Sequence, residues 1–160
     1  MIHAFKVYII PLLEYCSPVW SPHSLFEILR IESVQRFFTK YLPSCRDLSY
    51  KDRLNLFGLC TLERRRLVAD LVLFFKIVNK IIPIDLGESL KPFGHSITRG
   101  HSRRFKIPSS RIESRLNSYI VRTVKIWNDL DEHTVCIDSV IVFKKTISTY
   151  DFSKYLTFGF

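Results

Sequence analysis

The sequence has little glycine, one methionine and no long apolar run. Five glycines and seven prolines are too few for a low-complexity chain, and 47% hydrophobic residues with 13 phenylalanines exclude a disordered one. No stretch reaches the roughly 18 uncharged apolar residues of a spanning helix. The apolar run Val7–Leu13 is interrupted by Pro11 and is not interpreted as a signal sequence. We therefore expect a soluble intracellular protein with no membrane partner; the sequence does not distinguish nucleus from cytoplasm.

Motifs of metal binding and catalysis are also missing. The four cysteines are widely spaced and are expected to be reduced, mostly packed thiols. There is no glycine-rich phosphate loop, no Cys/His or Ser/His pair at a suggestive spacing, and no aspartate pair suited to two magnesium ions. Asp129 and Asp131 are interpreted as a cap or solvated turn, and His95 and His101 as loop residues. We expect no catalytic residue, no metal ligand and no cofactor in this chain.

What the sequence does contain is helical periodicity, clearest in Thr61–Ile82. Thr61 is a plausible N-cap and Pro83 marks the expected end. Apolar residues recur there at intervals of three and four, which place them on one stripe of a helix: Leu67, Leu71, Phe74, Phe75, Val78 and Ile82. Three arginines, Arg64 to Arg66, lie near the start of this helix, where the macrodipole disfavours cations. Something other than local helix stability must require them.

Three further helices are predicted before this one. Residues 2–15 form a helix interrupted at Pro11, and residues 50–57 form one with a capping box from Ser49 to Asp52 and Gly58 at its end. Between them, Ser24 caps a helix that runs to about residue 41. Its apolar face is expected to consist of Leu25, Ile28, Leu29, Val34, Phe37, Phe38 and Tyr41.

The second half of the chain is predicted to be a long connection followed by two more helices. Residues 83–112 have weak periodicity, with a short strand expected at Arg104–Ile107. Helical spacing returns around Trp127, which like Trp20 is expected to be a core residue, and again around Phe143, after a cap at Asp138 or Ser139. The predicted fold class is mainly α, a helical bundle with a long basic connection and two C-terminal helices. The expected divisions are residues 1–82, 83–112, 113–150 and a tail, 151–160.

The charge is strongly positive, at +9 with a sequence pI near 9.6, which predicts attraction to polyanions. Residues 95–125 carry eight cations against the single acid Glu113, a balance of +7: Arg99, Arg103, Arg104, Lys106, Arg111, Arg115, Arg122 and Lys125. Guanidinium groups among small residues suit a phosphate backbone. With about five phosphate contacts, log affinity falls with log salt at a slope of about −4 to −5. The alternative is a solvated basic loop without a ligand.

Several consecutive segments resemble one known family. They are YIIPLLEYCSPVWSPH, IESVQRFFTKYLP, RDLSYKDRLNLFGLCTLERRRLVADLVLFFKIVNK, TRGHS and VKIWNDLDEHTV, in this order. The chain is similar, from about residue 3 to residue 147, to the C-terminal region of jockey-like and related non-LTR (LINE-type) retrotransposon reverse transcriptases. There the region forms the polymerase thumb and the segment beyond it. The catalytic aspartates and their Mg²⁺ belong to the palm, which this chain lacks.

The resemblance implies a catalytically incomplete fragment of an RNA-directed DNA polymerase that is not an enzyme by itself. A thumb grips RNA, DNA or their hybrid through the backbone, so the candidate phosphate contacts are Arg64, Arg65, Arg66, Arg99, Arg103, Arg104, Lys106, Arg111 and Arg115. Replacing Arg64 to Arg66 together by Ala is expected to weaken binding and leave the helices intact. Two alternatives stay open: a helical module that binds a protein or itself through exposed aromatic residues, and a relic without a selected function.

Overall fold

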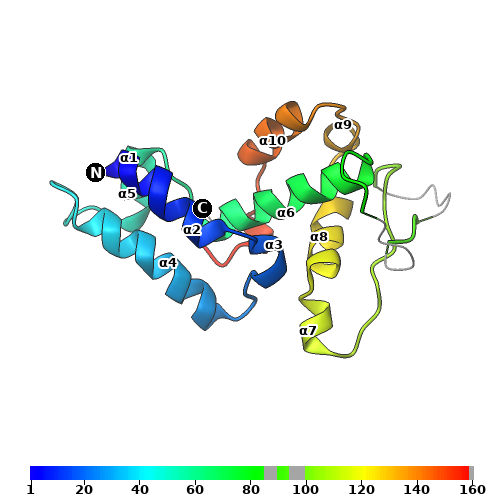
Figure 1. Cartoon of the computed structure of the whole chain (residues 1–160), viewed down its shortest axis with the longest axis horizontal. Coiled ribbons are helices and arrows are strands. Elements are labelled where there is room, and N and C mark those ends of the chain that lie inside the picture. The colour runs from blue at the N-terminus through cyan, green and yellow to red at the C-terminus, as the bar shows by residue number, and fades with distance from the viewer. Residues whose placement is uncertain (85–89, 94–99, 159–160) are drawn as a thin grey trace. The chain divides into compact units, whose positions relative to one another are not determined.

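The computed structural model describes residues 1–84, 90–93 and 100–158, and in these ranges the chain is mainly helical (Figure 1). The predicted fold class is thus confirmed. The same ranges contain no strand, because the one expected at Arg104–Ile107 is reduced to an isolated antiparallel bridge between Pro92 and Phe105. Among the helices described, none combines the length and apolar character needed to span a bilayer.

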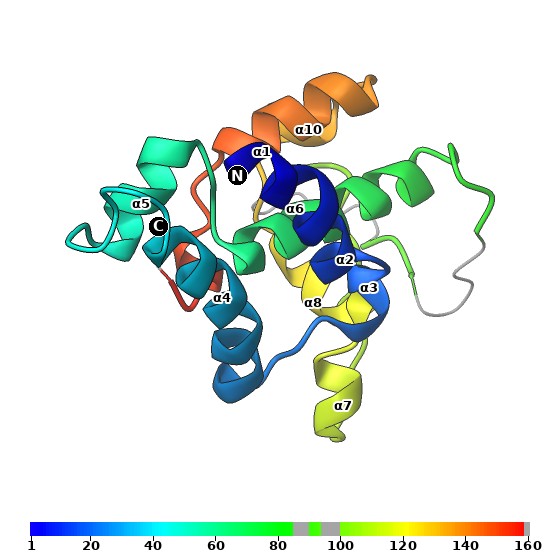
Figure 2. The same cartoon turned by 60° about the vertical axis from the view of Figure 1, so that its left-hand side comes forward.

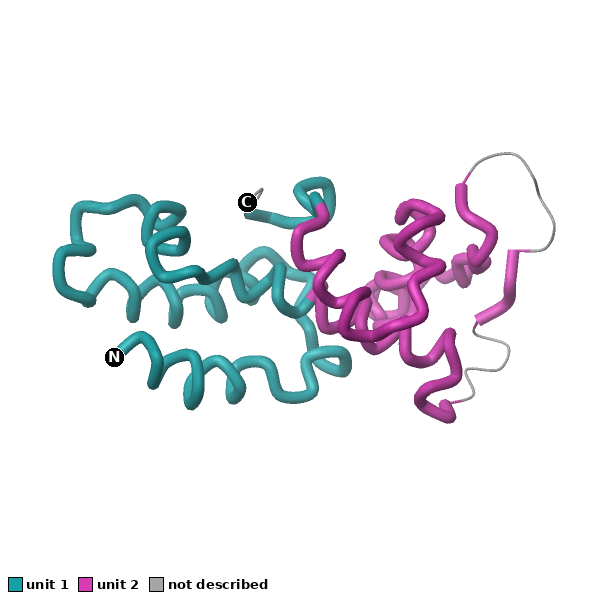
Figure 3. Tube along the Cα trace, turned by 90° about the horizontal axis from the view of Figure 1, so that it is seen from above, with its two compact units in different colours: residues 1–66, 151–160 teal, residues 67–150 magenta. Residues whose placement is uncertain are grey.

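The chain forms two compact units, coloured separately in Figure 3. Unit 1 comprises Met1–Arg66 and Asp151–Phe160, and unit 2 comprises Leu67–Tyr150. The boundary between them falls inside helix α6 (Leu62–Val78). The unit boundaries therefore differ from the divisions expected at residues 82 and 112, and the tail that follows residue 150 belongs to unit 1.

Unit 1 begins with one helical rod whose middle is a π-helix. It consists of α1 (Ile2–Ala4), the π segment η1 (Phe5–Ile9) and α2 (Ile10–Glu14). The Ile10 N–H donates to the Phe5 carbonyl, five residues back. This wider turn lies directly before Pro11, which cannot donate a backbone hydrogen bond. The predicted interruption at Pro11 is confirmed.

The next helices of unit 1 are α3 (Ser17–Trp20), α4 (Leu25–Lys40) and α5 (Tyr50–Phe57). The expected ends of α5 are confirmed, since the Ser49 hydroxyl accepts from the Asp52 N–H at 3.2 Å and Gly58 adopts a left-handed φ of 56°. Ser24 stands at the N-cap position of α4, as predicted, although its side chain makes no capping hydrogen bond.

Helix α4 buries a polar stripe and exposes most of its apolar residues. Its buried residues are Ile28, Glu32, Gln35 and Thr39, spaced by four, three and four. The predicted apolar face is therefore wrong except at Ile28 and the half-buried Phe38, because Leu25, Leu29, Val34, Phe37 and Tyr41 are exposed. The physical reason is that the polar side chains have partners: the Gln35 amide donates to the Tyr50 hydroxyl and the Cys60 carbonyl, both at 3.0 Å.

Helix α6 starts as predicted but ends four residues early. The Arg64 N–H donates to the Thr61 hydroxyl at 3.2 Å, which confirms the N-cap. At the other end Lys80 takes a left-handed φ of 55°. The Lys80 N–H then bonds the Ile77 carbonyl at 3.0 Å and the Ile81 N–H bonds the Lys76 carbonyl at 2.8 Å. This Schellman motif, not Pro83, stops the helix.

Besides the rest of α6, unit 2 contains α7 (Glu113–Leu116), α8 (Tyr119–Asn128), α9 (Glu132–Val135) and α10 (Val140–Thr149). Figure 2 shows α8 and α10 on opposite sides of α6. Its core is aromatic. Phe74 lies 5.1 Å from the Trp127 ring and Phe75 stacks on Phe143 at 4.2 Å, between ring centroids. The two predicted C-terminal helices and the buried Trp127 are confirmed, whereas Trp20 is 40% exposed.

Candidate nucleic-acid interface

The three arginines at the start of α6 bind other parts of unit 1. Arg65 forms a two-pronged ion pair with Glu14 of α2, with Nη2 2.9 Å from Oε2. The guanidinium of Arg64 lies 5.7 Å from the Phe152 ring centroid in the tail. Arg66 is only 2% exposed and lies 6.0 Å from the ring of Trp20. Arg66 in this position cannot reach a phosphate at the surface.

A buried carboxylate explains why Arg66 is inside. Glu32 of α4 accepts from the Leu62 N–H at 2.9 Å, at the first turn of α6, and from the Tyr50 hydroxyl. Burial raises the pKa of Glu32, while the Tyr50 hydrogen bond, the Leu62 N–H and the Arg66 charge lower it. The positive charge of Arg66 therefore favours the ionised form of this buried carboxylate. Arg66 belongs to the core of unit 1 and Arg65 pairs with Glu14, which gives these two arginines a role within the fold.

In unit 2, the segment from His101 to Lys106 is fixed by hydrogen bonds to α8. The Trp127 indole N–H donates to the Arg103 carbonyl at 2.8 Å. The Asn128 amide pairs with the backbone of Phe105 in both directions, at 3.0 and 2.8 Å. His101 is a buried loop residue whose Nε2 bonds the Trp127 carbonyl at 2.9 Å. This part of the basic connection is therefore well anchored.

Arg103 also serves this anchoring. Its Nη1 donates to the Asn79 side chain at 3.1 Å and to the Val135 carbonyl at 3.2 Å. The guanidinium joins the end of α6 to the end of α9. Like Arg66, it is engaged inside its own unit.

The remaining cations of this segment gather on one face of the bridge. Phe105 packs edge-on against Phe74 at 5.6 Å, between ring centroids, and so faces the core of unit 2. Side chains alternate along extended backbone, so the neighbouring Arg104 and Lys106 face the other way. The facing segment contributes Lys91 and Phe93 to that side. The Lys106 N–H donates to the Lys91 carbonyl at 2.8 Å, and the Phe93 N–H donates to the Arg104 carbonyl at 2.9 Å.

We call these four residues, Lys91, Phe93, Arg104 and Lys106, the basic face. The Arg104 guanidinium lies 5.1 Å from the Phe93 ring centroid, and both lysines are exposed. Lys91 and Lys106 stand directly opposite each other across the bridge, and like charges in such a pair repel. Two neighbouring ammonium groups can both contact one phosphate, and the Phe93 ring, 40% exposed, offers a surface on which a base can stack.

The other predicted contacts divide into exposed and engaged side chains. Arg111, which precedes α7, and Arg115, which lies in α7, are both exposed. Arg122 pairs with Asp70 at 2.8 Å, and Arg99 and His95 lie outside the described residues. The structure thus groups Arg104 and Lys106 with Lys91, which the sequence analysis missed. The matching alternation of Lys-Pro-Phe and Arg-Phe-Lys could have indicated it.

The structure also bears on metals and thiols. Among the residues described, no group of three or more His, Cys, Asp or Glu side chains is placed to hold a metal ion. Asp131 caps α9 by accepting from the Thr134 N–H at 2.9 Å, which confirms the cap interpretation for that residue. Cys16 and Cys136 are exposed, so the expectation of mostly packed thiols is wrong for these two.

Comparisons with protein-family models, with curated proteins and with solved structures found no match to this chain.

Proposed function

We propose that the chain binds RNA, DNA or their hybrid without sequence preference, through phosphates held at the basic face. The observation that supports this is the pairing of Lys91 with Lys106 on a bridge anchored to α8, with Arg104 and the Phe93 ring beside them. Arg111 and Arg115 follow within ten residues of Lys106 and are also exposed, so they add positive charge near it along the chain. Phosphate contacts of this kind give affinity without reading the base sequence.

We further propose that the chain is a piece of a non-LTR reverse transcriptase, the part that follows the palm. The order of the resembling segments supports this origin, and the mainly helical fold is compatible with a thumb. On this proposal the Mg²⁺ chemistry belongs to the absent palm. In a primer-extension assay on an RNA template, the chain alone should incorporate no nucleotide; metal-dependent synthesis would overturn the fragment proposal.

The binding proposal is tested by fluorescence anisotropy with labelled RNA and DNA over a salt series. Contacts with three or four phosphates of a duplex predict a slope of log affinity against log salt of about −3 to −4. The charge reversal Lys91→Glu with Lys106→Glu should weaken binding at least about tenfold and flatten the slope by about 2, roughly one for each lost contact.

The matched control reverses two exposed lysines of α10, Lys144→Glu with Lys145→Glu. It changes the net charge by the same amount but leaves the basic face intact, so binding should fall much less. Equal losses in the two variants would show that only net charge matters. No binding by the unaltered chain, or a flat salt response, would rule out the proposal.

A further inference from the structure

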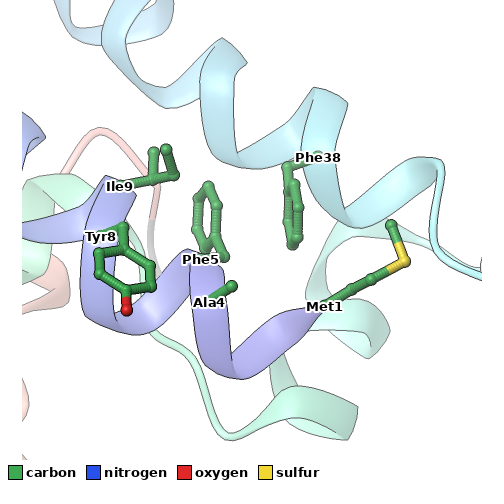
Figure 4. Close-up of a pocket in the computed structure, with 6 residues that line it drawn as sticks. All are labelled: Met1, Ala4, Phe5, Tyr8, Ile9 and Phe38. Atoms are coloured by element: carbon green, nitrogen blue, oxygen red, sulfur yellow. The ribbon is translucent and has the colours of Figure 1, made fainter.

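Two antiparallel helices of unit 1 leave an apolar seam open. The rod of α1, η1 and α2 runs opposite to α4, and the rings of Phe5 and Phe38 stack between them at 4.2 Å with planes 10° apart (Figure 1). Beside this stack lies an apolar pocket of about 260 Å³ (Figure 4). None of the side chains that line it is charged: Met1, Ala4, Phe5, Tyr8, Ile9 and Phe38.

The two helices expose a large aromatic area. The five most exposed rings or phenols are Tyr8 at 68%, Tyr15 at 77%, Phe26 at 71%, Phe37 at 66% and Tyr41 at 59%. With about 200 Å² for each aromatic side chain, these fractions amount to roughly 700 Å². A standard interface buries about 800 Å² on each partner. These five side chains alone nearly supply that area.

The core of unit 1 prevents α4 from turning its apolar residues inward. Rotating the helix would withdraw Glu32 from the Leu62 N–H and Gln35 from the Cys60 carbonyl. It would also leave both side chains buried without their partners, which is unfavourable. The outward direction of Phe37 and its neighbours is therefore set by the polar contacts on the opposite side of the helix.

We propose that this seam packs against the same seam of a second copy of the chain, so that two antiparallel helix pairs form a four-helix bundle. A bundle is the usual way for a helix pair to cover an apolar side. The side chains that line the pocket are uncharged, so they offer no attraction to a polyanion or an acidic peptide. The same patch then serves both partners, as two-fold symmetry requires.

The test is the mass of the full chain in solution, measured by analytical ultracentrifugation after nuclease treatment. Salt of about 0.5 M suppresses association through charges or residual nucleic acid but leaves an apolar interface intact. We expect a dimer, and Tyr8→Ser with Phe37→Ser should raise its dissociation constant at least about a hundredfold. Both side chains are exposed, so the helical circular dichroism should not change.

The control variant is Val19→Ser with Leu56→Ser, two exposed apolar residues on α3 and α5. It should remain dimeric. A chain that is monomeric at all concentrations, a dimer that both variants weaken equally, or a dimer that only the control weakens would overturn the proposal. Vesicles of anionic lipid that bind the unaltered chain through Tyr8 and Phe37, with no dimer present, would assign the seam to a membrane surface instead.

Discussion

At the scale of single residues, Arg66 is the strongest candidate for a structural cation. Replacing it with Met keeps the bulk but removes a positive charge that favours the buried Glu32 carboxylate, so Arg66→Met should lower the free energy of unfolding by about 1 to 3 kcal/mol. Arg64→Met removes a partly exposed contact with Phe152 and should cost less, about 0.5 to 1 kcal/mol. Urea unfolding followed by circular dichroism measures both.

Replacing Arg64, Arg65 and Arg66 together would therefore also disturb the fold, so this triple variant does not test phosphate binding by itself. If Arg66→Met and Arg64→Met have equally small effects, Arg66 is not the partner of Glu32. Phosphate binding is better examined at the basic face, where Lys91 and Lys106 are exposed.

His101 makes the stability of unit 2 depend on pH. Its Nε2–H donates to the Trp127 carbonyl and its Nδ1 accepts from the Arg103 N–H, so the folded chain requires the neutral ring. Burial lowers the pKa of His101 below its ordinary 6.5. The unfolded chain then binds more protons, and the stability is complete above about pH 6.5 and falls as the pH drops below it.

Thermal unfolding between about pH 7 and pH 5 tests this dependence. The variant His101→Gln, which cannot titrate, should lose part of the pH dependence, although it also starts from a lower stability. His133→Gln removes an exposed histidine and should retain it. An unchanged pH dependence in His101→Gln would place the titration elsewhere.

At the scale of elements, the end of α6 contains a residue in an unfavourable conformation. Lys80 adopts φ of 55°, where a side chain is strained and glycine is not. Lys80→Gly should stabilise the protein by about 0.5 to 1 kcal/mol. The same change at Lys144 inside α10 should destabilise it by about 1 kcal/mol. Melting temperatures of the two variants should therefore move in opposite directions.

The elements that could be predicted are those specified by near neighbours. Thr61, Ser49 and Gly58 act on residues within a few positions, and these helix ends are confirmed. The buried face of α4 was predicted wrongly because the hydrogen-bond partners of its polar stripe lie in residues 50 to 62. Periodicity within the helix does not reveal these partners. Lys91 was missed for the same reason, since only a pairing across fifteen residues brings it beside Lys106.

At the scale of the whole molecule, each unit has its own tryptophan. Trp20 lies in unit 1 and is 40% exposed, whereas Trp127 lies in the core of unit 2 and is fully buried. Trp20→Phe should therefore leave a blue-shifted emission that acrylamide barely quenches, while the unaltered chain should show a second, quenchable component. Strong quenching in Trp20→Phe would mean that the aromatic core of unit 2 is open to solvent.

The tail also determines the order in which the chain can fold during synthesis. Phe152 and Leu156 are buried in unit 1, and the Glu63 carboxylate accepts from the Thr157 N–H. These residues leave the ribosome after the whole of unit 2, which is continuous in sequence. Although the first segment of unit 1 is synthesised before unit 2, the fold of unit 1 can be completed only after its second segment has been synthesised. Its apolar seam is accessible to chaperones during that interval.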